Sequence, residues 1–210
     1  NWRTVAELLA QFTKQPLSVN FGTLVGHSTI SRAIASEALR ELNKNELAVF
    51  EEVLNRALKE GGFGFSTGLG YVHGRATPYA ELKLLANTVK KYNGVYATHV
   101  RKNGVDLLEA VNETIKLGKE TGVQLLLSHL FPARGAEKEY RASLEAISAY
   151  GKEHEIHFGI YPFDTGIFPI YNFLPQWAQN GGREIMIKNI EDEWMRPRIL
   201  KDMKVLNPED

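Results

Sequence analysis

Short apolar runs alternate with longer amphipathic segments along this sequence, and no other feature restricts its possible folds as strongly. Five β-strands are predicted by the apolar runs at 18–26, 62–66, 94–100, 123–130 and 156–161. Four helices are predicted between or after them by the periodicity at 46–60, 78–92, 105–121 and 137–153. Repeated strand and helix units are typical of a parallel sheet covered by helices. We therefore expect an α/β fold with about five β-α units.

The residues at the predicted helix ends support these assignments. Asn93 and Gly122 occur where a helix would end in a left-handed residue, and Pro78 occurs where a helix would begin. After residue 161 the alternation stops in a stretch rich in proline and aromatic residues, 162–177, which predicts a loop with one short helix. The segment 191–204 predicts a final helix.

Five parallel strands can belong to an open doubly wound sheet or to most of an eight-stranded barrel, and periodicity does not separate these folds. The glycine-rich stretch 62–68 does not decide the matter. Its glycines do not have dinucleotide-binding spacing, and no helical pattern follows at once, so we interpret them as turn and packing residues. No linker or low-complexity segment divides the chain, which predicts one domain over 1–210.

Composition narrows the classes of partner and ligand. The chain has 25 Lys and Arg against 25 Asp and Glu, so no net charge attracts it to nucleic acid or to a membrane surface. It has no cysteine, which leaves histidine and carboxylate as the strong metal ligands. No apolar run approaches the roughly 20 residues of a membrane helix. We expect a soluble cytoplasmic protein that acts on a small molecule, and the absence of an initial Met suggests that an upstream segment is missing.

Two histidines end neighbouring predicted strands. Functional groups of parallel α/β folds gather at the carboxyl ends of the strands, where His99 and His129 each follow an apolar run and a small hydroxyl residue. Adjacent strands lie about 4.8 Å apart, so imidazoles at matched heights can share one metal ion. We expect His99 and His129 on the inner side of the sheet, less than about 8 Å apart, as metal ligands. A hydrogen-bonded rim position is the alternative for a single histidine.

Several other residues are weaker candidates. His27 also follows an apolar run and could line the same mouth. Arg101 follows His99 by two residues and suits a substrate carboxylate, with a salt bridge at the rim as the alternative. His73 is expected in a loop. His154 and His157 are expected to be solvated or structural at the opposite end of the sheet.

Two tyrosines and one aspartate complete the candidates. Tyr71 and Tyr161 could present a phenol to a polarised carbonyl or to a substrate carboxylate, although Tyr161 could equally be packed. Asp164 is a carboxylate after a strand, but Asp-Thr-Gly is also an ordinary turn, which we favour.

The chain resembles the N-acyl-D-amino-acid deacylases, or D-aminoacylases, of the amidohydrolase superfamily. The resemblance covers nearly the whole chain and rests on motifs that occur in the family's order and at similar intervals. These motifs are LVGHST at 24–29, FSTGLGY at 65–71, THVR at 98–101, SHL at 128–130 and YPF at 161–163. Each motif alone is weak, whereas five in order are specific.

The resemblance implies part of a metal-dependent (β/α)8 barrel in which His99 and His129 bind zinc and Tyr71 helps to hold the substrate. It further implies that a zinc-activated water hydrolyses the amide bond of an N-acyl-D-amino acid, a non-peptide C–N bond. An early His-x-His pair and a bridging ligand would precede Asn1. The general base, an aspartate on a late strand, would follow Asp210.

Some positions depart from the family pattern. The lysine that usually follows the second histidine is replaced by Phe131, and the acidic residue after the arginine is replaced by Lys102 and Asn103. Gly159 stands where an acidic residue is common. A dihydroorotase-like or hydantoinase-like amide hydrolase and a non-catalytic fragment therefore stay open as alternatives. We expect the isolated chain to be inactive, with open strand edges covered by 162–177, the last helix or another copy in a homo-oligomer.

Overall fold

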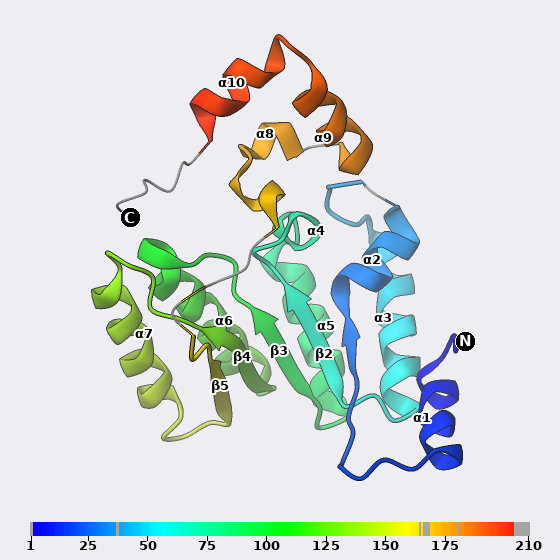
Figure 1. Cartoon of the computed structure of the whole chain (residues 1–210). Coiled ribbons are helices and arrows are strands. Elements are labelled where there is room, and N and C mark those ends of the chain that lie inside the picture. Colours follow the sequence, from blue (N-terminus) through cyan, green and yellow to red (C-terminus); the bar gives the residue numbers. More distant parts are fainter. Residues whose placement is uncertain (1, 37, 164, 166–168, 180, 204–210) are drawn as a thin grey trace.

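A computed structural model of the chain describes residues 2–36, 38–163, 165, 169–179 and 181–203. Its centre is one sheet of five parallel strands whose spatial order follows the sequence (Figure 1). The strands are β1 (Leu24–Gly26), β2 (Gly64–Gly68), β3 (Val95–His99), β4 (Gln124–Leu130) and β5 (Ile156–Ile160). This confirms the predicted α/β architecture with five parallel strands.

Helices cover one side of the sheet and return the chain to the start of each next strand. These are α3 (Lys44–Lys59), α5 (Tyr79–Lys91), α6 (Leu107–Thr121, after the 3-10 turn Gly104–Asp106) and α7 (Glu137–Tyr150). Local signals set their ends. Asn43 and Glu46 form a reciprocal capping box at the start of α3, and Gly122 ends α6 with φ of 67°. The four predicted helices are confirmed with small shifts of their ends.

The two sides of the sheet have different roles. Phe65, Tyr96, Leu125 and Leu127 are fully buried or nearly so, and they face the helices to form the main core. Phe65 meets Phe50 of α3 edge to face, with ring centroids 6.0 Å apart. Alternate residues of each strand point to the opposite side, which carries the functional side chains.

The first and last parts of the chain differ from expectation. The paired register of β1 with β2 starts at Leu24, so the strand is shorter than the predicted 18–26, and it leads directly into an unpredicted helix, α2 (His27–Ala35). Three further unpredicted helices are α1 (Val5–Lys14), the short α4 (Val72–Arg75) and α9 (Gly182–Glu191), whereas α10 (Met195–Asp202) lies within the predicted 191–204. None of the helices in the described part of the chain is long and apolar enough to cross a membrane.

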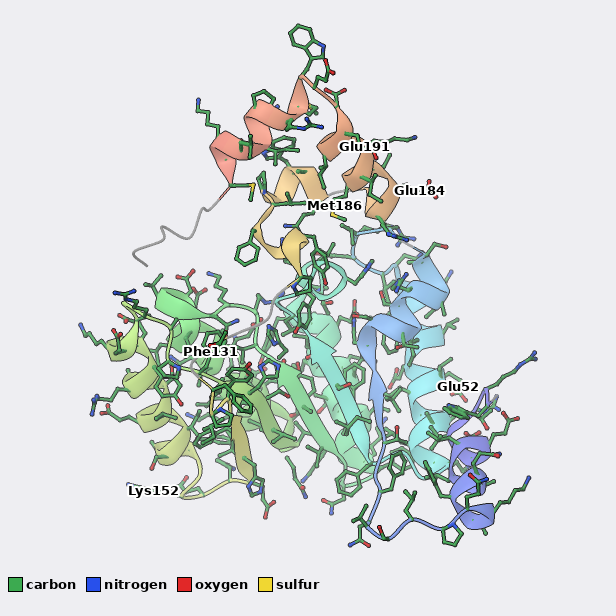
Figure 2. The ribbon with its side chains drawn as sticks, in the orientation of Figure 1. Glu52, Phe131, Lys152, Glu184, Met186 and Glu191 are labelled. Carbon is green, nitrogen blue, oxygen red and sulfur yellow. The ribbon has the colours of Figure 1, made fainter. Side chains whose placement is uncertain are left out.

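The C-terminal part forms a small helical lobe beyond the carboxyl ends of the strands (Figure 1). It contains η2 (Ile170–Phe173), α8 (Gln176–Gln179), α9 (Gly182–Glu191) and α10 (Met195–Asp202). Leu174, Ala178 and Ile199 form its core, and Met186 packs against them (Figure 2). Because the lobe lies beyond the strand ends, it does not run along β1 or β5. Of the three covers expected for the strand edges, the last helix is therefore wrong, whereas another copy of the chain stays a prediction.

Candidate metal-binding site

His99 and His129 lie side by side on the side of the sheet that faces away from the helices. His99 is the last residue of β3, and its Nδ1 lies 3.0 Å from Nε2 of His129 on β4. The ring centroids are 4.6 Å apart. Since Tyr96 and Thr98 face the helices, strand alternation places His99 on the opposite, inner side. The expected proximity of the two imidazoles is confirmed.

An irregularity in β4 brings His129 to this position. The register with β5 shifts between Leu127 and Leu130, and His129 has φ of 38°, in the left-handed region that residues other than glycine rarely adopt. A bulge of this kind changes the direction of a side chain relative to simple strand alternation. Unusual backbone of this type is concentrated at functional sites, and here it directs the second imidazole toward His99.

The environment keeps His99 neutral. Burial first, and then the charge of His129, lower the pKa of His99 to about 4. A neutral imidazole offers the lone pair that a metal ion needs. Two nitrogens bound to a tetrahedral zinc lie about 3.3 Å apart, close to the observed 3.0 Å, so the pair fits two positions of such a site. Among the described residues no group of three or more His, Cys, Asp or Glu completes a metal site.

The segment after β2 packs against His99. Tyr71 stacks on the His99 ring with centroids 4.4 Å apart and 24° between the planes. Gly70 lies so close that a Cβ atom there would stand 2.8 Å from Nε2 of His99. The backbone N–H of Leu69 donates to the His99 carbonyl at 3.0 Å. Gly70 therefore permits the close approach that places the Tyr71 ring on the imidazole.

Arg101 ties this segment to the sheet. Its Nε donates to the Glu113 carboxylate of α6 at 3.0 Å, its Nη1 to the Arg75 carbonyl at 3.0 Å, and its Nη2 to the Thr77 carbonyl at 3.1 Å. The salt bridge, which is the alternative role for this residue, is thus present. Contact between Arg101 and a substrate stays a prediction.

A cavity of about 950 Å³ opens beside the two histidines. Tyr161 lines it, and its hydroxyl donates to the Thr165 carbonyl at 2.9 Å. Phe131, just beyond β4 (Figure 2), contributes an apolar wall. Phe163 also lines the cavity. The cavity thus brings together all five predicted site residues, which are Tyr71, His99, Arg101, His129 and Tyr161. Their roles stay predictions.

The other candidates lie elsewhere. His27 is only 2% exposed, and its Nε2 lies 2.7 Å from the Glu81 carboxylate, so it is buried in the fold and does not line the mouth. His73 lies in α4, whereas we expected a loop. His157 is exposed near the start of β5. Asp164 is outside the described residues.

Two contributors to the site are not among the residues predicted from the sequence. Gly70 is named only as part of the FSTGLGY motif at 65–71, without a role of its own. Arg75 lies beyond the predicted strand at 62–66 and is not named. Both belong to the segment after β2, and the cavity includes both. The available signal is their position at the carboxyl end of a strand, where loops of parallel folds carry function.

Sequence comparison finds that the chain is similar to part of two longer deacylases. No family model matches the chain. The chain is 28% identical to D-aminoacylase of Alcaligenes xylosoxydans xylosoxydans over 165 residues, which are 77% of this chain and 34% of that protein. It is 31% identical to N-acyl-D-glutamate deacylase of the same organism over 149 residues, 69% of this chain and 30% of the relative. The chain thus spans about a third of the length of these relatives.

Solved structures show the same local fold. A D-aminoacylase structure described as defining a novel subset of amidohydrolases aligns with a TM-score of 0.71 at 28% identity, over 78% of this chain and 35% of that one. N-acyl-D-glutamate deacylase from Bordetella bronchiseptica, complexed with zinc and a phosphonate mimic of the tetrahedral intermediate, also aligns with a TM-score of 0.71 at 28% identity. The alignment covers 76% of this chain and 34% of that one. These neighbours confirm the expected segment of an amidohydrolase barrel.

Proposed function

Because the chain is homologous to the D-aminoacylases and N-acyl-D-amino-acid deacylases over part of their amidohydrolase fold, we propose that it forms part of a metal-dependent amide hydrolase. The substrates proposed are N-acyl-D-amino acids. In this proposal the chain contributes His99 and His129 as two zinc ligands. Further ligands and the general base come from outside the residues that the structure describes.

One observation carries this proposal: the 3.0 Å approach of the two imidazole nitrogens on the inner side of the sheet. Two histidines at neighbouring strand ends need not meet, since each could turn toward its own loop. The bulge at His129 and the packing of Gly70 and Tyr71 on His99 bring the two rings together. Neither ring has a carboxylate partner among the described residues, so both nitrogens can serve as ligands.

The chemistry divides between the metal and the protein. A bound zinc ion supplies a Lewis acid for the amide carbonyl and lowers the pKa of water. His99 and His129 hold the ion, and the stacked Tyr71 fixes the ring of His99. Tyr161 lines the cavity, where its phenol can orient a substrate. Phe131 provides an apolar wall that limits the access of bulk water.

Metal binding by the chain itself tests the proposal. Cobalt(II) replaces zinc in imidazole sites and gives an absorption spectrum, so titration can be followed directly. We expect about one equivalent to bind to the folded chain, with at least about tenfold weaker binding by His99→Ala and by His129→Ala. The matched control is His157→Ala, because His157 is an exposed histidine of the same sheet away from the cavity.

Three results would contradict the proposal. The first is no cobalt binding by the wild-type chain, the second is equal loss of cobalt binding in His157→Ala, and the third is unchanged binding in both site variants. Hydrolysis is tested separately, with a longer protein and a panel of N-acyl-D-amino acids, N-acyl-L-amino acids and cyclic amides. Preference for a cyclic amide would replace the proposed substrate with a hydantoinase-like one. We expect no turnover by the isolated 210-residue chain.

A further inference from the structure

The charged side chains that line the cavity are basic. The described lining residues that carry charge are Arg75, Arg101, Lys102 and Arg134, and no described aspartate or glutamate lines the cavity. The chain as a whole has equal numbers of acidic and basic residues, so this bias is local. A cavity with cationic walls attracts and orients an anionic ligand.

Two of these cations already have carboxylate partners. Every nitrogen of the Arg101 guanidinium donates to Glu113 or to a backbone carbonyl. Lys102 donates from Nζ to the Glu109 carboxylate at 2.8 Å. An Arg or Lys whose donors are occupied in this way has little capacity left to bind a ligand.

Arg75 differs from both. It is half-buried, it lines the cavity, and no carboxylate of the described residues forms an ion pair with it. Its Nη2 makes one long hydrogen bond, 3.4 Å, to the Gly70 carbonyl. A half-buried guanidinium with so few partners can bind a planar anion through two parallel hydrogen bonds.

Arg75 is also fixed next to the histidine pair. Gly70, whose carbonyl receives the guanidinium, lies against the imidazole of His99. The backbone carbonyl of Arg75 in turn accepts from Nη1 of Arg101. The side chain of Arg101 therefore holds the backbone of Arg75, while the side chain of Arg75 faces the cavity.

We propose that Arg75, and not Arg101, is the specificity-determining residue that binds the carboxylate of an N-acyl amino acid in this cavity. The inference rests on the proposed function for the identity of the ligand. Arg134 is the competing cation, but it is exposed and lies on the loop after β4. Arg75 combines partial burial, a fixed backbone and proximity to His99.

Binding of a charged and an uncharged ligand tests this assignment without any need for turnover. The probes are N-acetyl-D-alanine and its neutral methylamide, titrated into the 210-residue chain with EDTA present and followed by NMR. We expect the wild-type chain to bind the carboxylate at least about tenfold more tightly than the methylamide. Arg75→Gln should abolish this preference, and Arg75→Lys should keep part of it, because lysine preserves the charge but not the forked geometry.

The control is Arg141→Gln, which removes the same charge from the exposed surface of α7 and should change the preference by less than about twofold. Thermal unfolding of each variant verifies that the fold is retained. The inference is overturned if Arg75→Gln keeps the preference, if Arg134→Gln alone removes it, or if the wild-type chain shows none.

Failure of this inference and failure of the proposed function give different results. If cobalt binds through His99 and His129 but the carboxylate preference survives Arg75→Gln, only the assignment of Arg75 is wrong. If Arg75→Gln removes the preference but the chain binds no cobalt, the cavity is an anion site and the hydrolase proposal fails.

Discussion

Two histidine sites in this fold begin from similar sequence positions and end in different environments. His27 comes directly after β1 and His99 ends β3, each after an apolar run. His27 is buried against Phe50 and Phe65, and its Nε2 is 2.7 Å from Glu81. His99 faces the cavity, where its neighbour is a second imidazole.

The difference arises from the element that comes after each strand and from the partner that each ring meets. After β1 the chain enters α2 at once, and His27 becomes its first residue, so the ring turns into the helix layer. His99 stays within its strand and points to the inner side. A carboxylate partner makes His27 a structural residue, whereas the low pKa of His99 and its position beside a second imidazole leave a lone pair for a metal ion. The position of a histidine at a strand end therefore does not by itself indicate a metal site. The side chains around the ring must also be known.

The largest expected effect is on catalysis. In a longer protein that contains the missing part of the barrel, His99→Ala and His129→Ala should each reduce amide hydrolysis to the level of a metal-free control, because the ion loses a ligand. Far-UV circular dichroism and the urea midpoint should remain close to wild type, since neither ring belongs to the main core. Full activity in either variant would place the metal elsewhere.

Removal of the buried pair of His27 and Glu81 should lower stability and leave metal binding unchanged. Glu81→Ala removes the partner of His27 inside the fold and should lower the free energy of unfolding by about 3 kcal/mol. Cobalt binding by the molecules that remain folded should not change, because Glu81 does not line the cavity at His99. Urea denaturation followed by fluorescence measures the loss. A stable Glu81→Ala chain with weakened metal binding would reverse the roles of the two sites.

Arg101 connects the surroundings of His27 with those of His99, and its replacement should have an intermediate effect on stability. It holds the carbonyls of Arg75 and Thr77, and the Thr77 hydroxyl lies 3.4 Å from His27. Arg101→Gln should cost about 1 to 2 kcal/mol of unfolding free energy. Hydrogen exchange should increase mainly over 70–78. Faster exchange spread evenly over the sheet would mean that Arg101 supports the core and not this segment.

The exposed ion pair of Arg40 and Glu46 should have the smallest effect on stability, in contrast with the buried pair of His27 and Glu81. The hydrogen bond from Arg40, followed by the backbone hydrogen bond at Asn43, lowers the pKa of Glu46 to about 2. Because the folded pKa is below the unfolded value, this contribution to stability is complete above about pH 4.5 and disappears as the pH falls through about 2. Arg40→Gln should therefore weaken stability slightly at pH 5 to 7 and by much less at pH 2.

The control for this measurement is Arg56→Gln, which removes an exposed i,i+4 ion pair from the same helix. Its effect should also be small, but it leaves the capping box of α3 intact. If Arg40→Gln destabilised the chain equally at pH 2 and pH 6, the Arg40–Glu46 interaction would not be the cause. Urea midpoints measured at both pH values decide between these outcomes.

The sequence predicted the regular part of the fold well, for reasons that are local. Alternating apolar runs and helical periodicity depend on which residues must leave water, and each segment records that requirement by itself. Helices that share the connection between two strands with a longer helix were missed. The short α4 at Val72–Arg75 has no periodicity to detect, and α2 begins inside what looked like a strand end.

The sequence by itself determined the repeated strand and helix units, the two sides of the sheet and the height of His99 and His129 at the strand ends, because backbone geometry imposes these on any such pattern. Only the tertiary structure decided which side chains meet. The bulge at His129, the contact of Gly70 with His99, the carboxylate beside His27 and the partners of Arg101 all join residues distant in sequence. Such contacts depend on how whole elements pack together, and no local pattern records them.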